Sequence, residues 1–305
     1  MTPQEPPTEP PTVVGLGEVL WDVFEDEARF GGAPANFASH AAALGARAFM
    51  VSAVGDDALG RRARETLRAL GVNTEAVASI ADAPTGTVEV RLDAQGRPQY
   101  TIHRGVAWDQ IPWTRATQTL ARETDAVCFG TLAQREETSR RTIHRFLEAV
   151  PSACLRVLDI NLRQAYYSRS VIEQSLRRCD VLKLNDGELP VLAEMFELAG
   201  DEESSLSEQL IDRFDLHHVV VTLGERGAML AGPSGQVSAR SKPVQVRDTV
   251  GAGDAFTAAV TMGLLAGSDL QALARYACDV AGYVCTQAGA VPALPDRLRQ
   301  FPAED

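Results

Sequence analysis

Short apolar runs alternate with helical patterns from Ala126 to Ala231, and this order constrains the fold more than any other feature of the sequence. Strands joined by helical crossovers pack as a mostly parallel, twisted sheet with helices on both faces. We therefore predict an α/β fold of three layers in one domain spanning residues 12–305. The expected strands are Ala126–Phe129, Arg156–Ile160, Val181–Leu184, Val219–Thr222 and Ala228–Ala231, and the expected helices are Glu137–Ala149, Val171–Arg178, Leu189–Leu198 and Leu206–Phe214.

The N-terminal part of the chain contains a segment that departs from this alternation. Residues Thr85–Gly105 have the pattern of a β-hairpin, because β-branched and aromatic residues flank the turn Asp93–Gly96. We predict that residues of about 19–31 and 85–106 form a small β-sheet that covers a cleft as a lid, and an ordinary edge hairpin is the alternative. The more regular elements around it are strands at Thr12–Leu16 and Phe49–Val54, an alanine-rich helix that ends at Leu44, and a helix at Leu59–Leu70.

Composition and net charge exclude several classes of binding partner. The net charge of −12 opposes attraction to nucleic acid or anionic lipid. No apolar run approaches the roughly 18–20 residues that a membrane helix needs. The five cysteines are scattered and form no C-x-x-C pair, which predicts reduced thiols. Residues 1–11 are proline-rich and lack the basic and apolar regions of a signal peptide, so we expect a disordered tail and a cytoplasmic protein.

Polar, turn-forming residues follow four successive expected strands, the last of them ending near Val246. In parallel sheets, ligands bind beyond the carboxyl ends of the strands. We therefore predict a site along this edge of the sheet. Arg163 could hold a phosphate or carboxylate, or only form a surface ion pair. Glu188 could hold Mg²⁺ through water, or serve only as an acid at a helix start. The four segments are Asp159–Arg163, Asn185–Glu188, Thr222–Gly227 and Asp248–Asp254.

The segment Asp248–Phe256 joins an expected strand to an expected helix, Ala255–Leu265, through a turn with two glycines. Without Cβ atoms, Gly251 and Gly253 let backbone N–H groups converge at a helix N-terminus, where the helix dipole also favours negative charge. Such a turn could bind a phosphate, and Asp254 beside it could accept the proton of an attacking hydroxyl. An aspartate that caps an ordinary helix is the alternative reading.

Three common enzyme motifs do not occur in the chain. The dinucleotide-binding fingerprint fails after Gly15 and Gly17, because Leu20 stands where the third glycine would fall. No Walker P-loop occurs, and no G-x-S-x-G elbow supports a serine hydrolase. The five histidines form no cluster in the sequence, and we interpret them as structural or solvated.

Two glycine-rich segments resemble the two signatures of the PfkB, or ribokinase-like, family of sugar and nucleoside kinases. The resemblance runs from about Thr12 to the C-terminus, and the occurrence of both signatures in order is highly specific. The first signature is Gly31–Ala38 with Gly45 and Gly55 at the expected distances, and the second is Asp248–Asp254. The subtype is most similar to bacterial fructokinases, through Gly17–Phe24, Ala107–Asp109, Asp159–Arg163 and Leu182–Asn185.

This resemblance implies a ribokinase-like fold and an ATP-dependent sugar kinase whose substrate is a ketohexose, with fructose as the leading candidate. It implies that Asp254 is the catalytic base and that the amides of Gly251, Ala252, Gly253 and Asp254 form an anion hole. Sugar contacts would come from Asp22, Gly32, Asn36 and Arg163, and nucleotide contacts from Asn185, Thr222, Gly224 and Gly227. Glu188 would bind Mg²⁺ through water, and Asp248 and Val250 would belong to a K⁺ site, although Ala293 replaces a hydroxyl residue often found there.

Other functions remain open at this point. A 2-keto-3-deoxygluconate kinase is one alternative, because Arg163 could equally meet the carboxylate of a sugar acid. Another PfkB sugar or nucleoside kinase would share the same residues. A sugar or nucleotide sensor without catalytic activity belongs to a different class. The expected partners are the small-molecule sugar and ATP, and we expect no binding to nucleic acid or membrane. The sequence leaves open whether the chain forms a homodimer.

Overall fold

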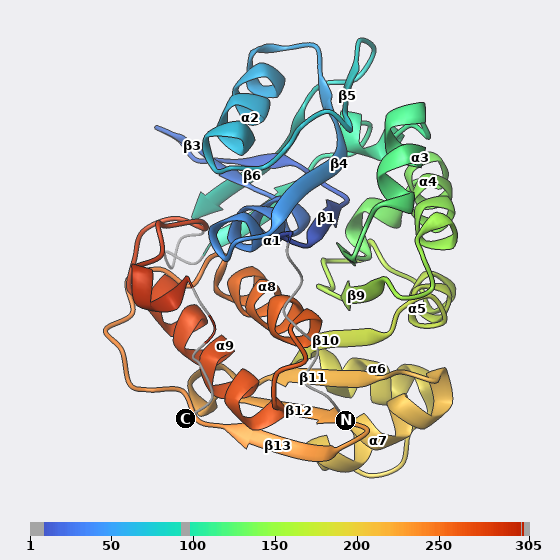
Figure 1. Ribbon diagram of the computed structural model, residues 1–305. Coiled ribbons are helices and arrows are strands. Elements are labelled where there is room, and N and C mark those ends of the chain that lie inside the picture. The colour runs from blue at the N-terminus through green and yellow to red at the C-terminus, as the bar shows by residue number, and fades with distance from the viewer. Residues whose placement is uncertain (1–8, 93–97, 300, 302–305) are drawn as a thin grey trace.

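A nine-stranded sheet forms the middle layer of the protein (Figure 1). The computed structural model describes residues 9–92, 98–299 and 301. Seven neighbouring strands run parallel, and the last two, β12 and β13, are antiparallel to their neighbours. Along the sheet the strands lie in the order β13 (Gly235–Ala239), β12 (Ala228–Gly232), β11 (His218–Thr222), β10 (Val181–Asn185), β9 (Leu155–Asp159), β8 (Ala126–Phe129), β1 (Thr12–Leu16), β4 (Arg47–Gly55) and β5 (Val77–Ile80).

Helices cover both faces of this sheet, which confirms the predicted three-layer α/β fold (Figure 1). One face packs against α1 (Ala33–Ala43), α2 (Ala58–Ala69), α8 (Ala252–Leu265) and α9 (Leu270–Cys285). The other face packs against α3 (Arg115–Arg122), α4 (Glu137–Ala149), α5 (Arg169–Leu176), α6 (Glu188–Phe196) and α7 (Glu203–Phe214). No helix within the residues that the structure describes is long and apolar enough to cross a bilayer.

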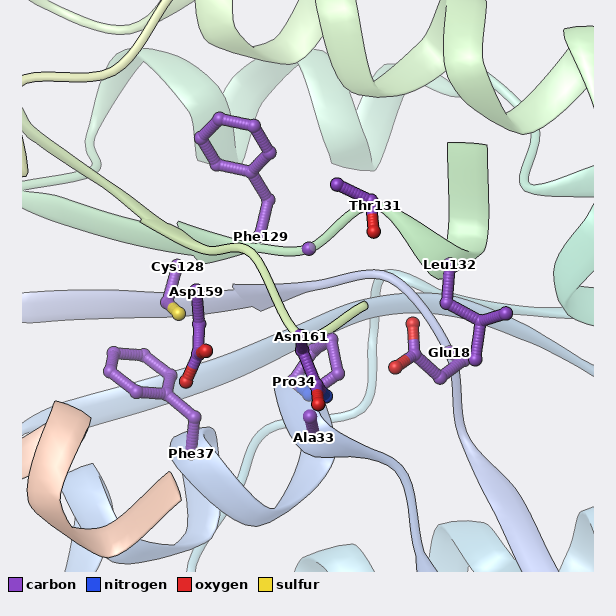
Figure 2. A pocket seen from close by; sticks show the side chains of 11 residues that line it. Glu18, Ala33, Pro34, Phe37, Cys128, Phe129, Thr131, Leu132, Asp159 and Asn161 are labelled. Carbon is purple, nitrogen blue, oxygen red and sulfur yellow. The ribbon is translucent and has the colours of Figure 1, made fainter. Parts of the chain in front are cut away.

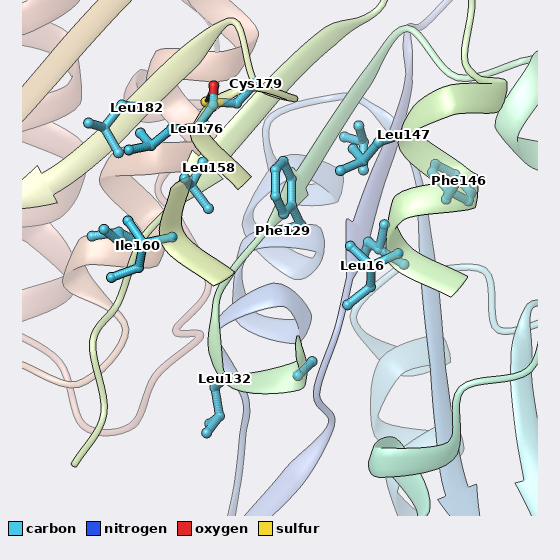
Figure 3. Packing of buried hydrophobic residues seen from close by; sticks show 14 of the residues in the cluster. Leu16, Phe129, Leu132, Phe146, Leu147, Leu158, Ile160, Leu176, Cys179 and Leu182 are labelled. Atoms are coloured by element: carbon cyan, nitrogen blue, oxygen red, sulfur yellow. Dashed lines mark hydrogen bonds between the residues drawn. The ribbon is translucent and has the colours of Figure 1, made fainter. Parts of the chain in front are cut away.

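The strands are apolar on both faces because both faces are covered, as is usual for parallel sheets. In β8, the whole run Ala126–Phe129 is buried. Phe129 lies between the sheet and α4, where Phe146 and Leu147 meet it, and Leu158 and Leu182 extend the same layer toward α5 (Figure 3). This packing holds the carboxyl ends of the central strands in fixed positions.

A second, four-stranded sheet lies beside the first and consists of β3 (Ala28–Gly31), β2 (Leu20–Val23), β6 (Gly86–Leu92) and β7 (Pro98–Ile102). The strands β6 and β7 form the predicted hairpin, whose turn at residues 93–97 lies outside the described residues. The strand β2 joins the hairpin through parallel pairing with β6. These strands fall within the predicted bounds of 19–31 and 85–106, and the role of this sheet as a lid stays a prediction.

The structure corrects some of the expected elements. Residues 240–247 form no strand, and Val244 and Val246 are exposed, because no neighbouring strand lies beside them to pair with. Consequently three strands, not four, carry the polar segments, and Asp248–Asp254 follows a loop. The helix expected to begin at Ala255 begins at Ala252. The elements α3, α9, β5 and β13 were not predicted.

The cysteine and tail predictions have separate outcomes. All five cysteines are free, as expected, and four of them are buried. Of the predicted disordered tail, residues 1–8 lie outside the part of the chain that the structure describes.

Candidate active site

The N-terminus of α8 has the geometry of an anion-binding turn. Gly251 has a φ of 79°, and a Cβ atom there would lie 2.1 Å from the carbonyl oxygen of Ala290, so a glycine is required. No side chain caps this end of the helix. Within the described residues, the N–H groups of Gly251, Gly253 and Asp254 donate to no backbone carbonyl outside a helix or strand, whereas Ala252 N donates to Thr249 at 3.3 Å. The turn therefore presents free N–H donors at the positive end of a helix.

Asp254 lies in the first turn of α8 and meets Asn36 from α1. The amide Nδ2 of Asn36 donates a hydrogen bond of 2.8 Å to Asp254 Oδ2. The pKa of Asp254 is raised to about 6, mainly by burial and also by the charge of Asp159, while Asn36, Lys183 and Arg163 act in the opposite direction. The Oδ1 atom of Asn36 is buried and has no hydrogen-bond partner among residues 9–92, 98–299 and 301. The pair thus presents a carboxylate and a free acceptor, both of which suit a hydroxyl-bearing ligand.

A buried ion pair lies behind this turn. Lys183 Nζ lies 3.1 Å from both carboxylate oxygens of Asp159. The hydroxyl of Thr257, on α8, lies 2.9 Å from Asp159 Oδ2 and 2.9 Å from the carbonyl oxygen of Gly253. Burial alone would lower the pKa of Lys183, but the negative charges around it more than offset this effect and keep it charged.

Glu18 is a second buried carboxyl group at the same edge of the sheet. Its Oε2 atom has no hydrogen-bond partner within the described part of the chain, and burial raises the pKa of Glu18 to about 7. Glu18 and Asn161 point into a cavity of about 10 Å³ that Asp159 also lines (Figure 2). A cavity of this size holds about one water molecule. Such a water could give Glu18 the partner that it lacks.

Arg163 is the positively charged member of the predicted sugar-binding residues. Its side chain follows β9 and is exposed. Burial raises the pKa of Glu18, Asp22 and Asp254, and the charge of Arg163 opposes that rise at all three. The charge of Arg163 therefore acts on three carboxyl groups from separate segments of the chain.

The two predicted residues Asn185 and Glu188 hold the adjoining strand ends together. Glu188 accepts one hydrogen bond on each oxygen, from Leu162 N at 2.8 Å and from Asn185 N at 2.9 Å. Asn185 Oδ1 accepts the N–H groups of Gly187 and Glu188 at the start of α6. Each carboxylate oxygen of Glu188 has a further lone pair, so water-mediated contact to a cation remains available to it.

The other predicted nucleotide residues lie beside this pair. Thr222 is the register partner of Asn185 in the neighbouring strand. Gly224 follows it in a short 3₁₀ turn, where an added Cβ would meet no atom within 4 Å. At Gly227 an added Cβ would lie 1.9 Å from the carbonyl oxygen of Ala239, so the backbone packing of β13 already accounts for this glycine.

Asp248 connects the loop before α8 to the loop after α9. Its two oxygens accept the N–H groups of Val250 at 3.0 Å and Gly289 at 3.2 Å. Asp248, Val250 and Asp22 line one pocket of about 340 Å³, bounded by the small sheet, α2 and residues 288–291. Among residues 9–92, 98–299 and 301, no group of three or more His, Cys, Asp or Glu side chains could hold a metal ion. A cation here would need further ligands from phosphates, water or backbone carbonyls beside any single carboxylate.

Lys183 and Glu18 were not among the predicted site residues, and Asp159 was predicted only as part of the segment Asp159–Arg163, without a role of its own. The sequence carries a signal for Lys183, since it is the only charged residue in the apolar run Val181–Leu184. A charge inside a strand that is covered on both faces needs a buried partner. Asp159, at the end of the neighbouring strand, is that partner.

Comparison with known proteins gives a family and several matching folds. The family described as pfkB family carbohydrate kinase matches residues 11–297. The fructokinase of Klebsiella pneumoniae is 34% identical over 304 residues, which cover 92% of this chain and 95% of that protein.

Two solved structures with ligands share the fold. An uncharacterized sugar kinase from Pyrococcus horikoshii, in complex with ATP, is 26% identical with a TM-score of 0.78, covering 91% of this chain and 93% of that one. A fructokinase double mutant from Vibrio cholerae, with fructose, ADP and potassium ion bound, is 25% identical with a TM-score of 0.77, covering 94% and 96%.

Proposed function

We propose, from the premise that this chain belongs to the pfkB family of carbohydrate kinases, that it transfers the γ-phosphoryl group of ATP to a hydroxyl of fructose or a closely similar ketohexose. That it is a sugar phosphotransferase follows from the family and its fructokinase relatives. The ketohexose and the roles of individual residues are the proposed part. The observation that carries them is the contact of Asn36 with Asp254 beside the free amides of the α8 turn.

In this proposal Asp254 accepts the proton of the attacking hydroxyl. The hydroxyl oxygen bonds to the γ-phosphorus, the bond from that phosphorus to the bridging oxygen breaks, and ADP leaves. Asp254 need not be a strong base, because phosphoryl transfer depends mainly on positioning and on stabilising spread charge. Gly251, Gly253 and Asp254 would direct their N–H groups at the phosphoryl oxygens that carry this charge.

The sugar would lie between Asp254 and the small sheet. Asn36 Oδ1, buried and unpartnered, would accept a sugar hydroxyl, and Asp22 would accept another. The charge of Arg163 would favour the ionised forms of Asp22 and Asp254, and its N–H groups would donate to the sugar oxygens. Gly32 would bring the backbone close to the sugar, since its φ of 108° and its contact with Glu18 leave no room for a side chain. The small sheet would close over the sugar and exclude water.

The nucleotide would lie along the ends of β10 and β11. Asn185, Thr222 and Gly224 would face it, and Gly227 would shape the turn behind them. Glu188 would hold Mg²⁺ through water, consistent with its remaining lone pairs, and bound Mg²⁺ neutralises charge on the phosphate oxygens. Asp248 and Val250 would position the loops of a K⁺ site, which agrees with the potassium found in the Vibrio cholerae fructokinase.

A coupled assay of ADP release tests the substrate. The purified chain is given ATP and Mg²⁺, with and without K⁺, and fructose, tagatose, ribose, 2-keto-3-deoxygluconate or a nucleoside. We expect the highest kcat/KM with fructose. A higher value with 2-keto-3-deoxygluconate would assign Arg163 to a sugar-acid carboxylate instead. ADP release that no sugar stimulates would support a sensor and contradict the proposed function.

A further inference from the structure

The buried ion pair of Lys183 and Asp159 has no part in the transfer described above. The side chains are only 9% and 7% exposed, and Nζ lies equally far from both carboxylate oxygens. Removing two charges from water is costly, and such a pair often stabilises a fold no better than apolar residues of similar volume. Its position directly behind the α8 turn indicates a use other than stability.

Two contacts connect this pair to the anion-binding turn. Thr257 bridges Asp159 Oδ2 and the carbonyl oxygen of Gly253 at 2.9 Å each, and it lies one helical turn after Gly253. Lys183 approaches the same glycine, since a Cβ added at Gly253 would lie 3.2 Å from Nζ. The positive member of the pair therefore lies against the backbone that precedes Asp254.

The two members act on Asp254 with opposite sign. Burial dominates the raised pKa of Asp254, Asp159 raises it further, and Lys183 lowers it. Both members are buried, so salt screens them little. The other groups that face Asp254 are Asn36 from α1, Arg163 after β9, Glu18 after β1 and Cys128 from β8.

We propose that Lys183 and Asp159 are positioning residues for phosphoryl transfer. Lys183 keeps the carboxylate of Asp254 ionised, while Asp159 fixes Lys183 in place and anchors the first turn of α8 through Thr257. This inference rests on the proposed role of Asp254 and adds the means by which its charge is controlled.

The test is a titration of Asp254 in the whole protein by ¹³C NMR, with aspartate labelled at Cγ. The resonance that disappears in Asp254→Asn identifies the residue. We expect Lys183→Met to raise the pKa of Asp254 by roughly one unit, the scale of a lost opposite charge nearby. Asp159→Asn should lower the pKa of Asp254, and in the double variant this pKa should lie between the values of the two single variants. Lys242→Met, which removes an exposed lysine paired with Asp279, should leave it unchanged.

A second readout separates this role from a purely structural one. The turnover of Lys183→Met should recover toward the wild-type value as the pH is raised, because hydroxide restores the ionised Asp254. An unchanged titration in Lys183→Met, or shifts of the same sign in both single variants, would overturn the inference. If Lys183→Met does not fold, the double variant is compared with Asp159→Asn, and equal pKa values of Asp254 in these two would overturn it.

The outcomes distinguish this inference from the proposed function. The titration needs no activity, so it reports on Lys183 even if Asp254 is not the base. Wild-type turnover in Asp254→Asn would contradict the proposed role of Asp254 as the base, while the effect of Lys183 on the pKa of Asp254 would still be measurable. If the pKa of Asp254 is the same in Lys183→Met as in the wild type and Asp254→Asn is inactive, only the role of the ion pair is contradicted.

Discussion

Asn36 Nδ2 donates a hydrogen bond of 2.8 Å to Asp254 Oδ2, which joins two residues 218 positions apart in the chain. The contact places the first helix of the protein against the helix that carries the proposed base. The amide oxygen of Asn36, Oδ1, has no hydrogen-bond partner among the residues that the structure describes, so in the proposed function it is free to accept a sugar hydroxyl.

Replacing Asn36 with alanine should weaken both functions of this side chain. Since a hydrogen bond to a charged group contributes about 1.5–3 kcal/mol, we expect kcat/KM for the sugar to fall by roughly tenfold or more. Steady-state kinetics measure this change. Ser39→Ala, on the same helix, removes a hydroxyl that bonds only to Ala35 O and should retain wild-type kinetics. Equal kinetics in both variants would contradict the assignment of Asn36.

Gly251→Ala should damage the anion-binding turn more than a positive φ alone would. A left-handed backbone costs an alanine roughly 1–2 kcal/mol, and here its Cβ would also meet Ala290 O at 2.1 Å. Gly267→Ala is the matched control, because its φ of 70° is similar and its Cβ would meet nothing within 4 Å. We expect Gly251→Ala to lose more thermal stability and also ATP affinity, measured by calorimetry. Similar losses in both variants would argue against a special role for the turn.

Glu18→Gln should stabilise the protein at high pH. Glu18 has a pKa of about 7 in the fold against 4.5 unperturbed, so the folded state keeps its proton while the unfolded chain loses it. The stabilisation from this group is therefore fully present below about pH 4.5 and is lost as the pH rises through about 7. Between pH 5.5 and 8 the free energy of unfolding should fall by roughly 2 kcal/mol. Denaturant unfolding at both pH values should show that the gain of Glu18→Gln over wild type is larger at pH 8 than at pH 5.5, by roughly 2 kcal/mol. A pH-independent difference would contradict the buried, unpaired carboxyl.

Turnover of the wild type should decline as the pH falls through about 6, where Asp254 becomes protonated. The measurement is kcat at saturating ATP and fructose from pH 5 to 8, with unfolding followed in parallel. A constant kcat between pH 7 and 5 in folded protein would show that no group with the pKa of Asp254 limits the reaction.

The sequence predicts most of the sheet because its central strands are covered on both faces and therefore read as unbroken apolar runs. Val219–Val221 and Ala126–Phe129 are clear examples. The alternation at Val244 and Val246 has the pattern of a strand but lacks a neighbour, and pairing between distant segments leaves no local signal. The helix α9 does carry one, since Asp269 caps it.

The site was predictable where a motif requires a special backbone, as at Gly32 and Gly251. Contacts between distant residues were not predictable, because the partner of Lys183 and the burial of Glu18 depend on how strands pair and where loops turn. Asn185 and Glu188 illustrate the difference: their position at the site was predicted, whereas their hydrogen bonds to the strand ends required the structure.

Turnover of Asp254→Asn tests the central claim most directly. With saturating ATP, Mg²⁺ and fructose, we expect kcat to fall by roughly 10²–10⁴-fold, the usual contribution of a general base, while calorimetry shows ATP still bound. Asp269→Asn, which changes an exposed acid at the start of the next helix, is the matched control and should keep wild-type turnover. Wild-type kcat in Asp254→Asn would contradict the proposal that this carboxylate accepts the sugar proton.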